Sequence, residues 1–177
     1  LVVDDVQAAE VDRLMRLVRR ILPDLDPGSA RRALEALLVA MDRYRAYVVP
    51  GRAVDPEQAA VIEAAAGRAR AHLAPTDEPA LGVIVDLVLD RDLRDPALDT
   101  GPRADDFRVR FQQTCGPVMA KGIEDTAYYR WFRLAGANEV GGHPDHLSIS
   151  AEEFHTWCGR LVASWPTSMT TLTTHDT

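Results

Sequence analysis

The sequence predicts a mainly α-helical chain with one or two short strands, and two observations lead to this fold class. Over the first two-thirds of the chain, apolar residues recur at helical spacing between prolines and capping residues. Two short stretches, 44–49 and 168–174, are instead rich in β-prone residues, and we expect strands there. The 177 residues correspond to about one domain, and with 46% hydrophobic residues the chain can form a core.

The first two helices are marked by apolar faces and by proline. We expect a helix over 3–22 that Pro23 ends. Asp26 and Pro27 provide an N-cap and a first-turn proline for a second helix that continues to about residue 44. The apolar residues expected on the buried faces of these helices are Val6, Leu14, Leu17, Val18, Ile21, Leu34, Leu37, Leu38 and Met41.

Two further helices and a loop complete this part of the chain. Asp55 begins a helix to about residue 73, with Gln58 at the capping-box position. Thr76 is expected to cap the next helix, which ends near Asp90. The stretch 91–103 combines prolines, a glycine and many charges. We therefore expect a loop there, which separates a helical subdomain at 1–90 from a second part at 104–177.

The second part begins with helical segments. A helix is expected over 104–113, with a break at Gly116 and Pro117, because proline disfavours a helical conformation for the residue before it. The stretch 126–134 can continue as helix.

A loop, a helix and a strand are expected to follow. The stretch 138–148 contains two adjacent glycines and a proline, which predict an irregular surface loop. Ser150 and Glu153 form a capping box for a helix that ends before Pro166. The β-prone stretch 168–174 comes next.

Charge and cysteine content limit the possible partners and the environment. The net charge of −7 and the sequence pI near 5.2 argue against a nucleic-acid partner or an acidic membrane surface. No stretch approaches the ~20 apolar residues of a membrane span. Cys115 and Cys158 show no CxxC or zinc spacing, so we expect buried, reduced thiols in a cytoplasmic protein. The chain opens on Leu1, and we interpret it as a piece of a longer protein.

The densest group of charged, aromatic and glycine residues lies in segment 110–142, which reads RFQQTCGPVMAKGIEDTAYYRWFRLAGANEVGG. It contains Lys121, the only lysine of the chain. In a helix, Lys121 would face Glu124 and Asp125, and a surface ion pair of roughly 0.3 kcal/mol is the ordinary interpretation. Gly122 indicates a turn or a close approach instead, because glycine within an exposed helix costs about 1 kcal/mol.

This segment resembles the maltooligosyltrehalose synthases, a family within the α-amylase superfamily of glycoside hydrolases. The pattern expected for the family is RFQQT-GPVMAKG-EDTA-YR-RL-NEVGG, followed by a Ser/Thr-rich strand ending in THDT. Both pieces occur here in that order. The chain departs from the pattern at Cys115, where Thr is common, and at Trp131 and Phe132, where Tyr-Asn is expected.

The resemblance implies a fold and a catalytic residue. It makes 1–90 a helical insertion subdomain and 104–177 part of a (β/α)8 barrel, whose late strand spans 169–174. In such barrels, side chains at the C-terminal ends of strands form the active site. By resemblance, Asp176 is the third catalytic carboxylate, which holds the sugar 2- and 3-hydroxyls, and His175 donates hydrogen bonds to sugar hydroxyls.

The resemblance also implies a set of substrate-binding residues. Carboxylates and amines bind sugar hydroxyls, and aromatic rings stack on the apolar faces of glucose. The set comprises Lys121, Glu124, Asp125, Tyr128, Arg130, Asn138 and Glu139. A metal is not expected, because His143, Asp145 and His146 lie in a proline-containing loop without a fixed geometry. We expect no cofactor.

The reaction that the resemblance implies is the isomerisation of the reducing-end α-1,4 linkage of maltooligosaccharides to an α,α-1,1 linkage. The nucleophile and the acid/base of the family belong to motifs that this chain does not contain, so we expect the chain alone to be inactive. The expected partners are a maltooligosaccharide and the remainder of the parent chain. Two alternatives remain open: another hydrolase or transglycosylase of the superfamily, and a non-enzymatic helical interaction domain.

Overall fold

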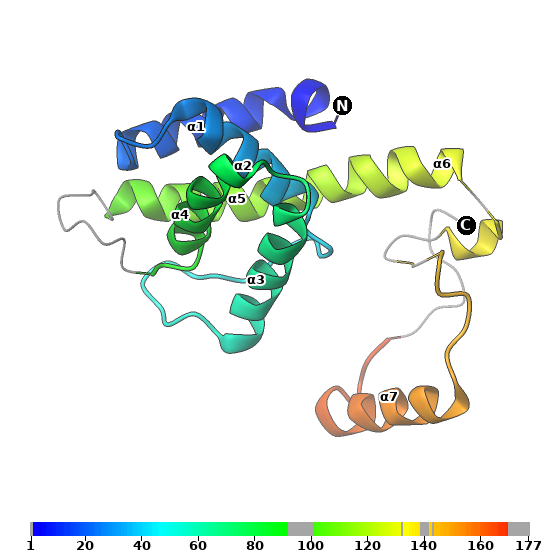
Figure 1. Cartoon of the computed structure of the whole chain (residues 1–177). Coiled ribbons are helices and arrows are strands. Elements are labelled where there is room, and N and C mark those ends of the chain that lie inside the picture. The colour runs from blue at the N-terminus through cyan, green and yellow to red at the C-terminus, as the bar shows by residue number, and fades with distance from the viewer. Residues whose placement is uncertain (1, 92–100, 132, 139–141, 143, 170–177) are drawn as a thin grey trace. The chain divides into compact units, whose positions relative to one another are not determined.

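The computed structural model describes residues 2–91, 101–131, 133–138, 142 and 144–169, and all regular structure among them is helical (Figure 1). The predicted helical class is thus confirmed, and the barrel part is not seen. The chain forms two compact units, Leu1–Gly122 and Ile123–Thr177, which are described separately below. The α-helices are α1 (Ala8–Ile21), α2 (Pro27–Val39), α3 (Pro56–Arg70), α4 (Glu78–Val88), α5 (Pro102–Met119), α6 (Tyr128–Arg130) and α7 (Ala151–Ser164).

Shorter helical turns join these elements. A π-helical segment Val2–Val6 precedes α1, and a second one, Ala120–Ala127, joins α5 to α6. Single 3-10 turns lie at Pro75–Asp77, before α4, and at Ala135–Ala137. No helix in the described part of the chain is both long and apolar enough to cross a membrane.

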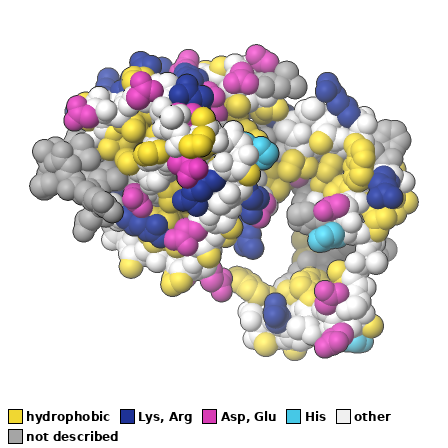
Figure 2. Space-filling model, viewed as in Figure 1, with side chains coloured by type: hydrophobic (Ala, Val, Ile, Leu, Met, Phe, Trp, Pro, Cys, Tyr) yellow, Lys and Arg dark blue, Asp and Glu magenta, His cyan; other side chains and the backbone are white. Residues whose placement is uncertain are grey.

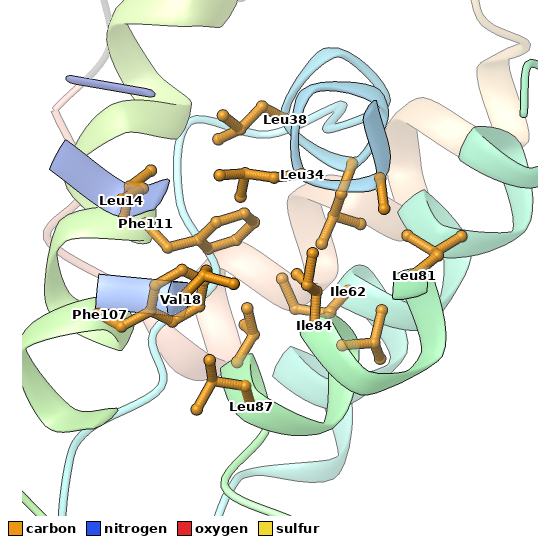
Figure 3. Close-up of a cluster of buried hydrophobic side chains, with 14 of the residues drawn as sticks. Leu14, Val18, Leu34, Leu38, Ile62, Leu81, Ile84, Leu87, Phe107 and Phe111 are labelled. Carbon is orange, nitrogen blue, oxygen red and sulfur yellow. The ribbon is translucent and has the colours of Figure 1, made fainter. Parts of the chain in front are cut away.

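The core of the first unit surrounds α5, which packs against α1, α2 and α4. Phe107 and Phe111 are fully buried, and their stacked rings lie 6.2 Å apart between centroids. Figure 3 shows side chains from α1 to α4 converging on these two rings. Burying one such side chain contributes about 1.5–3 kcal/mol, so this cluster is the main source of stability in the unit.

Three of the predicted helix starts are confirmed by their caps. The carboxylate of Asp26 accepts a hydrogen bond from the backbone N–H of Ser29 at 2.8 Å. Asp55 caps α3 through the N–H of Glu57 at 2.7 Å. Ser150 and Glu153 form the complete capping box at α7, with distances of 3.2 and 2.8 Å.

Two predicted caps are wrong. Gln58 does not close a capping box, because its Oε1 accepts from the N–H of Tyr47 at 3.0 Å. Thr76 lies inside a 3-10 turn, and Asp77 occupies the N-cap position of α4. The Asp77 carboxylate binds Arg32 of α2 instead of a backbone N–H, which makes it a tertiary contact.

The predicted break at Gly116 and Pro117 is also wrong, because α5 continues to Met119. A proline within a helix costs about 3 kcal/mol. Cys115 and Val118 are buried on either side of it, and their burial offsets that cost. Cys115 is buried as expected, whereas Cys158 is only partly buried.

The stretch 44–49 forms no strand, in contrast to the prediction. Ala46 and Val48 are buried while Tyr47 and Val49 are exposed, and the N–H of Val48 donates to the carbonyl of Ala46 at 2.9 Å. The alternation therefore arises from packing on one side, without a neighbouring strand. Of the second predicted strand, 168–174, only the first two residues lie among those described.

The later part of the chain follows the prediction in places. Helix 126–134 is observed as far as Arg130, after which Trp131 is extended. Most of the predicted loop 91–103 lies outside the described residues. The two compact units divide near residue 122. The assignment of 1–90 to an insertion subdomain and of 104–177 to a barrel stays a prediction.

Candidate functional site

The predicted substrate-binding residues meet most closely at a turn of the second unit. Asn138 donates from Nδ2 to the backbone carbonyls of Tyr128, at 3.0 Å, and Trp131, at 2.8 Å. The Tyr128 hydroxyl donates to the carbonyl of Gly142 at 2.5 Å. The side chains of Tyr128 and Asn138 therefore join α6 to the segment that follows it. We call Tyr128, Trp131, Asn138 and Gly142 the Tyr128 turn.

Burial and two neighbouring charges shift the pKa of Tyr128 in the same direction. Burial raises the pKa of its hydroxyl, and the negative charges of Glu124 and Asp145 raise it further. The phenol therefore stays protonated at neutral pH and acts as a hydrogen-bond donor. Asn138 Oδ1 is buried and accepts no hydrogen bond from any described residue.

The other predicted site residues are distributed differently. Asp125 and Arg130 are exposed in the second unit, and Lys121 is exposed near the end of the first unit. Glu139, His175 and Asp176 lie outside the described residues. The structure thus brings together Tyr128, Asn138 and Glu124, and contact of any of these residues with sugar stays a prediction.

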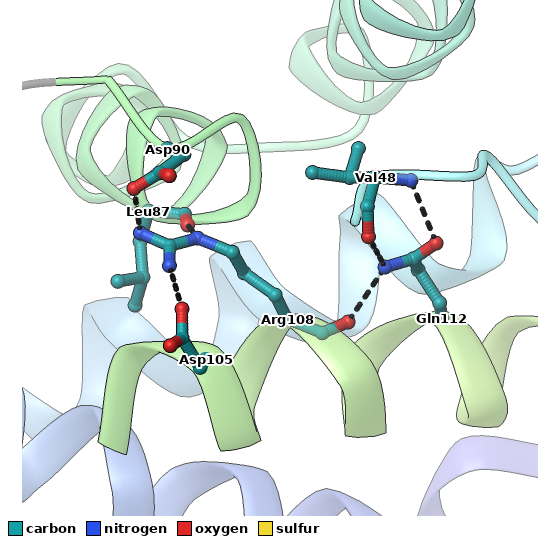
Figure 4. Close-up of polar contacts among 6 residues, drawn as sticks. All are labelled: Val48, Leu87, Asp90, Asp105, Arg108 and Gln112. Atoms are coloured by element: carbon teal, nitrogen blue, oxygen red, sulfur yellow. Dashed lines mark hydrogen bonds and ion pairs between the residues drawn. The ribbon is translucent and has the colours of Figure 1, made fainter. Parts of the chain in front are cut away.

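The first half of the family-like segment has a structural role that sequence reasoning missed. Gln112 of α5 holds the backbone of Val48 at both polar atoms, donating to its carbonyl at 2.8 Å and accepting from its N–H at 3.0 Å (Figure 4). Its Nε2 also donates to the carbonyl of Arg108, one turn earlier, at 3.1 Å. Gln112 therefore holds the stretch 44–49 at Val48 without a sheet.

Arg108 is the second buried polar residue of α5. It donates to the carbonyl of Leu87 at 2.9 Å and to Asp105 at 2.6 Å, and it pairs with Asp90 (Figure 4). Asp90 has a φ of 54°, a left-handed conformation that costs energy for a residue with a side chain. The ion pair with Arg108 holds it at the end of α4.

The surface of the first unit carries no single-sign charged face in the view of Figure 2, where acidic and basic side chains alternate. The ion pairs of this unit include Arg68 with Asp42 and Arg110 with Asp106. Among the described residues, no group of three or more His, Cys, Asp or Glu side chains is placed to hold a metal ion.

Comparison with known proteins identifies this helical chain as homologous to part of a much longer protein. The relative is described as "Putative maltooligosyl trehalose synthase" and comes from two strains of Mycobacterium tuberculosis. In both, the identity is 36% over 170 residues, which cover 96% of this chain and 19% of the relative. The chain thus spans about a fifth of the length of these relatives. No family model and no solved structure matches it.

Proposed function

We propose that this chain is part of an enzyme that converts the reducing-end α-1,4 linkage of a maltooligosaccharide into an α,α-1,1 linkage by intramolecular transglucosylation. The observation that carries the proposal is the homology, which extends over nearly the whole chain to a relative described as a maltooligosyl trehalose synthase. The family-like segment 110–142 supports it, because its resemblance to the family pattern runs from the second half of α5 through the Tyr128 turn.

The chemistry proposed for the parent enzyme is a retaining double displacement. An enzyme carboxylate outside this chain attacks the anomeric carbon of the penultimate glucose, and the acid/base of the parent protonates O4 of the reducing-end glucose as that glucose leaves. The released glucose then attacks the same carbon through its own anomeric hydroxyl, which gives its proton to the acid/base and displaces the carboxylate, while water is excluded. In this scheme Asp176 holds the 2- and 3-hydroxyls of the reacting sugar, and His175 donates hydrogen bonds to it.

The Tyr128 turn is proposed as part of the wall of the sugar site. Its hydrogen bonds fix the backbone, and its protonated phenol lies beside two carboxylates. Tyr129, next to it, is 79% exposed and presents a ring on which glucose could stack. These features support a binding role for the second unit, with catalysis assigned to Asp176 and to groups elsewhere in the parent.

The test is the parent enzyme incubated with maltopentaose. The expected product is a non-reducing oligosaccharide, measured by loss of reducing ends without a change in chain length. A hydrolase would produce new reducing ends, and another transglycosylase would produce chains of altered length, so either result contradicts the proposal. The 177-residue chain alone is expected to give no product.

Asp176→Asn in the parent is expected to lower kcat by at least roughly 100-fold, because hydrogen bonds to the 2-hydroxyl contribute several kcal/mol in the transition state. Asp24→Asn, an exposed carboxylate of the first unit, is the matched control and should keep full activity. Near-normal turnover of the Asp176 variant would refute the assigned role.

A further inference from the structure

Helix α7 carries an apolar face that no other described residue of the second unit covers. Phe154 precedes Trp157 and Cys158 by three and four residues and Leu161 follows them by four and three, which places these four side chains on one side of the helix; Trp165 follows at the C-cap. Phe154, Trp157 and Trp165 are 48%, 51% and 72% exposed, and α7 buries none of its residues. Figure 2 shows apolar side chains at its surface. We call these five residues the α7 face.

The helix is well formed despite this exposure. Its N-terminus has a complete capping box, and its charged residues are Glu152, opposite the apolar face, and Glu153 and Arg160 at the edge of that face. A helix of this length is marginal in water by itself, and most helical stability in proteins comes from packing of an apolar face. In α1, by comparison, the apolar face is buried in the core, and it includes Leu14, Val18 and Ile21. Two tryptophans and a phenylalanine on one face are typical of a contact surface.

We propose that the α7 face packs against an apolar surface of the parent protein that lies outside this chain. The proposal rests on the parent enzyme proposed above, since the chain covers 19% of the relatives and about four-fifths of their length lies beyond it. The partner surface should be apolar, with hydrogen-bond acceptors within reach of the two indole N–H groups, because buried indoles usually find an acceptor.

A second copy of the chain fits the face less well. An aromatic side chain buries about 150–250 Å² when fully covered, so these half-exposed residues leave only a few hundred Å² to bury. A stable association between separate molecules needs about 800 Å² per partner. Two surfaces of the same polypeptide lose less entropy when they associate than two separate molecules do. A small apolar face is therefore enough for a stable contact within one chain.

A membrane surface also fits less well. Helices that bind at the surface of anionic membranes carry lysine and arginine on the polar side. The charged residues of α7 are two glutamates, Glu152 and Glu153, in its first turn and one arginine, Arg160. Its charge would repel anionic lipid headgroups.

Cys158 lies within the α7 face and allows a direct test. It is partly exposed, whereas Cys115 is buried and serves as an internal control. The parent protein is treated with N-ethylmaleimide, and the alkylation rate of each cysteine is followed by peptide mass spectrometry. In the native parent, Cys158 is expected to react at least about 100-fold more slowly than in the urea-denatured parent, as Cys115 does. In the 177-residue chain, Cys158 is expected to react fast.

Variants of the parent sharpen the comparison. Trp157→Ser should open the contact and raise the alkylation rate of Cys158 by about tenfold or more, while Cys115 stays slow. Val39→Ser, which changes an exposed valine of the first unit, is the matched control and should leave both rates unchanged.

Several results would overturn the proposal. Fast alkylation of Cys158 in the native parent would show that the parent does not cover α7. Protection of Cys158 in the 177-residue chain that grows with its concentration would indicate a second copy. Protection there by phosphatidylglycerol vesicles or by maltopentaose would indicate a membrane or a sugar. Because alkylation is measured without turnover, a parent with a different activity would refute the proposed function and leave this result standing.

Discussion

At the scale of single residues, the contact between Asp77 and Arg32 predicts how stability changes in acid. Asp77 has a nearly buried side chain, and Arg32 donates to its two oxygens at 2.7 and 2.9 Å. These hydrogen bonds lower the pKa of Asp77 from 3.8 to about 2. Because the pKa is lower in the folded state, the contact stabilises the fold above about pH 4, and this contribution is lost as the pH falls through 2.

Asp77→Asn is therefore expected to lower the urea midpoint of unfolding at pH 7. The difference in midpoint between this variant and the unsubstituted chain should shrink between pH 4 and pH 2. Glu78→Gln is the matched control, since Glu78 is an exposed neighbour on the same turn. Urea titrations at a series of pH values measure both variants. A difference that stays constant down to pH 2 would show that Arg32 does not stabilise the charged form.

Gln112 provides a prediction with a closely matched control. Gln112→Leu removes the partner of two backbone groups of Val48, and its carbonyl is then left buried without a donor. Leaving such a group unsatisfied costs about 1–3 kcal/mol, so the free energy of unfolding should fall by about 2 kcal/mol. Gln113→Leu, at the exposed neighbouring glutamine of α5, should change it by less than about 0.5 kcal/mol. Equal effects of the two substitutions would contradict the structure.

At the scale of elements, the capping box of α7 predicts local stability. Ser150→Ala removes the side chain that accepts from Glu153, which costs about 1 kcal/mol. Amide hydrogen exchange within Ala151–Ser164 should speed up by about fivefold, and exchange in α5 should not change. Ser148→Ala, an exposed serine ahead of the helix, is the control. Unchanged exchange in α7 after Ser150→Ala would show that the cap does not hold the helix.

Among the helices and loops, local features of the fold could be predicted from the sequence and those that depend on distant contacts could not. The caps at Asp26, Asp55 and Ser150 were predictable because the side chain and the N–H that it binds lie within three residues. The continuation of α5 through Pro117 was not, because burial of distant side chains against α5 decides it. In the stretch 44–49, the alternation of small or apolar with larger side chains correctly predicted that one side is buried. It could not reveal that no other strand pairs with this stretch among the described residues.

The candidate site could be predicted only in part. The family-like pattern singled out Tyr128 and Asn138, but their shared hydrogen bonds depend on the path of the turn between them, which no spacing reveals. Gln112 lay within the same pattern, and its structural role depends on Val48, 64 residues earlier. The available signal for a buried Gln112 was its position next to Phe111 on an amphipathic helix.

At the scale of the whole molecule, the first unit has the organisation of an independent folding unit. Its helices surround α5, and the residues buried around Phe107 and Phe111 come from all five helices α1 to α5. Domains of this size have a free energy of unfolding of about 5–15 kcal/mol, so the loss of one core contact is a large fraction of the total. This unit should therefore unfold in a single transition.

Leu34→Ala tests this cooperativity. Leu34 of α2 is fully buried, and its truncation should lower the free energy of unfolding by about 3 kcal/mol, through lost burial and the cavity that remains. Val39→Ala, on the same helix and 64% exposed, should have little effect. Circular dichroism at increasing urea concentrations reports the loss of helix in each variant.

Cys115 provides a second probe of the same transition. Burial raises the pKa of its thiol to about 12, and its Sγ donates to the carbonyl of Phe111 at 3.2 Å, so it should be unreactive while the core is intact. In a Cys158→Ser background, its alkylation should begin at the urea concentration at which the helical signal is lost. Leu34→Ala should move both curves together, because α2 and α5 share one core. Alkylation of Cys115 well before the loss of helix would instead show that α5 opens separately from the rest of the unit.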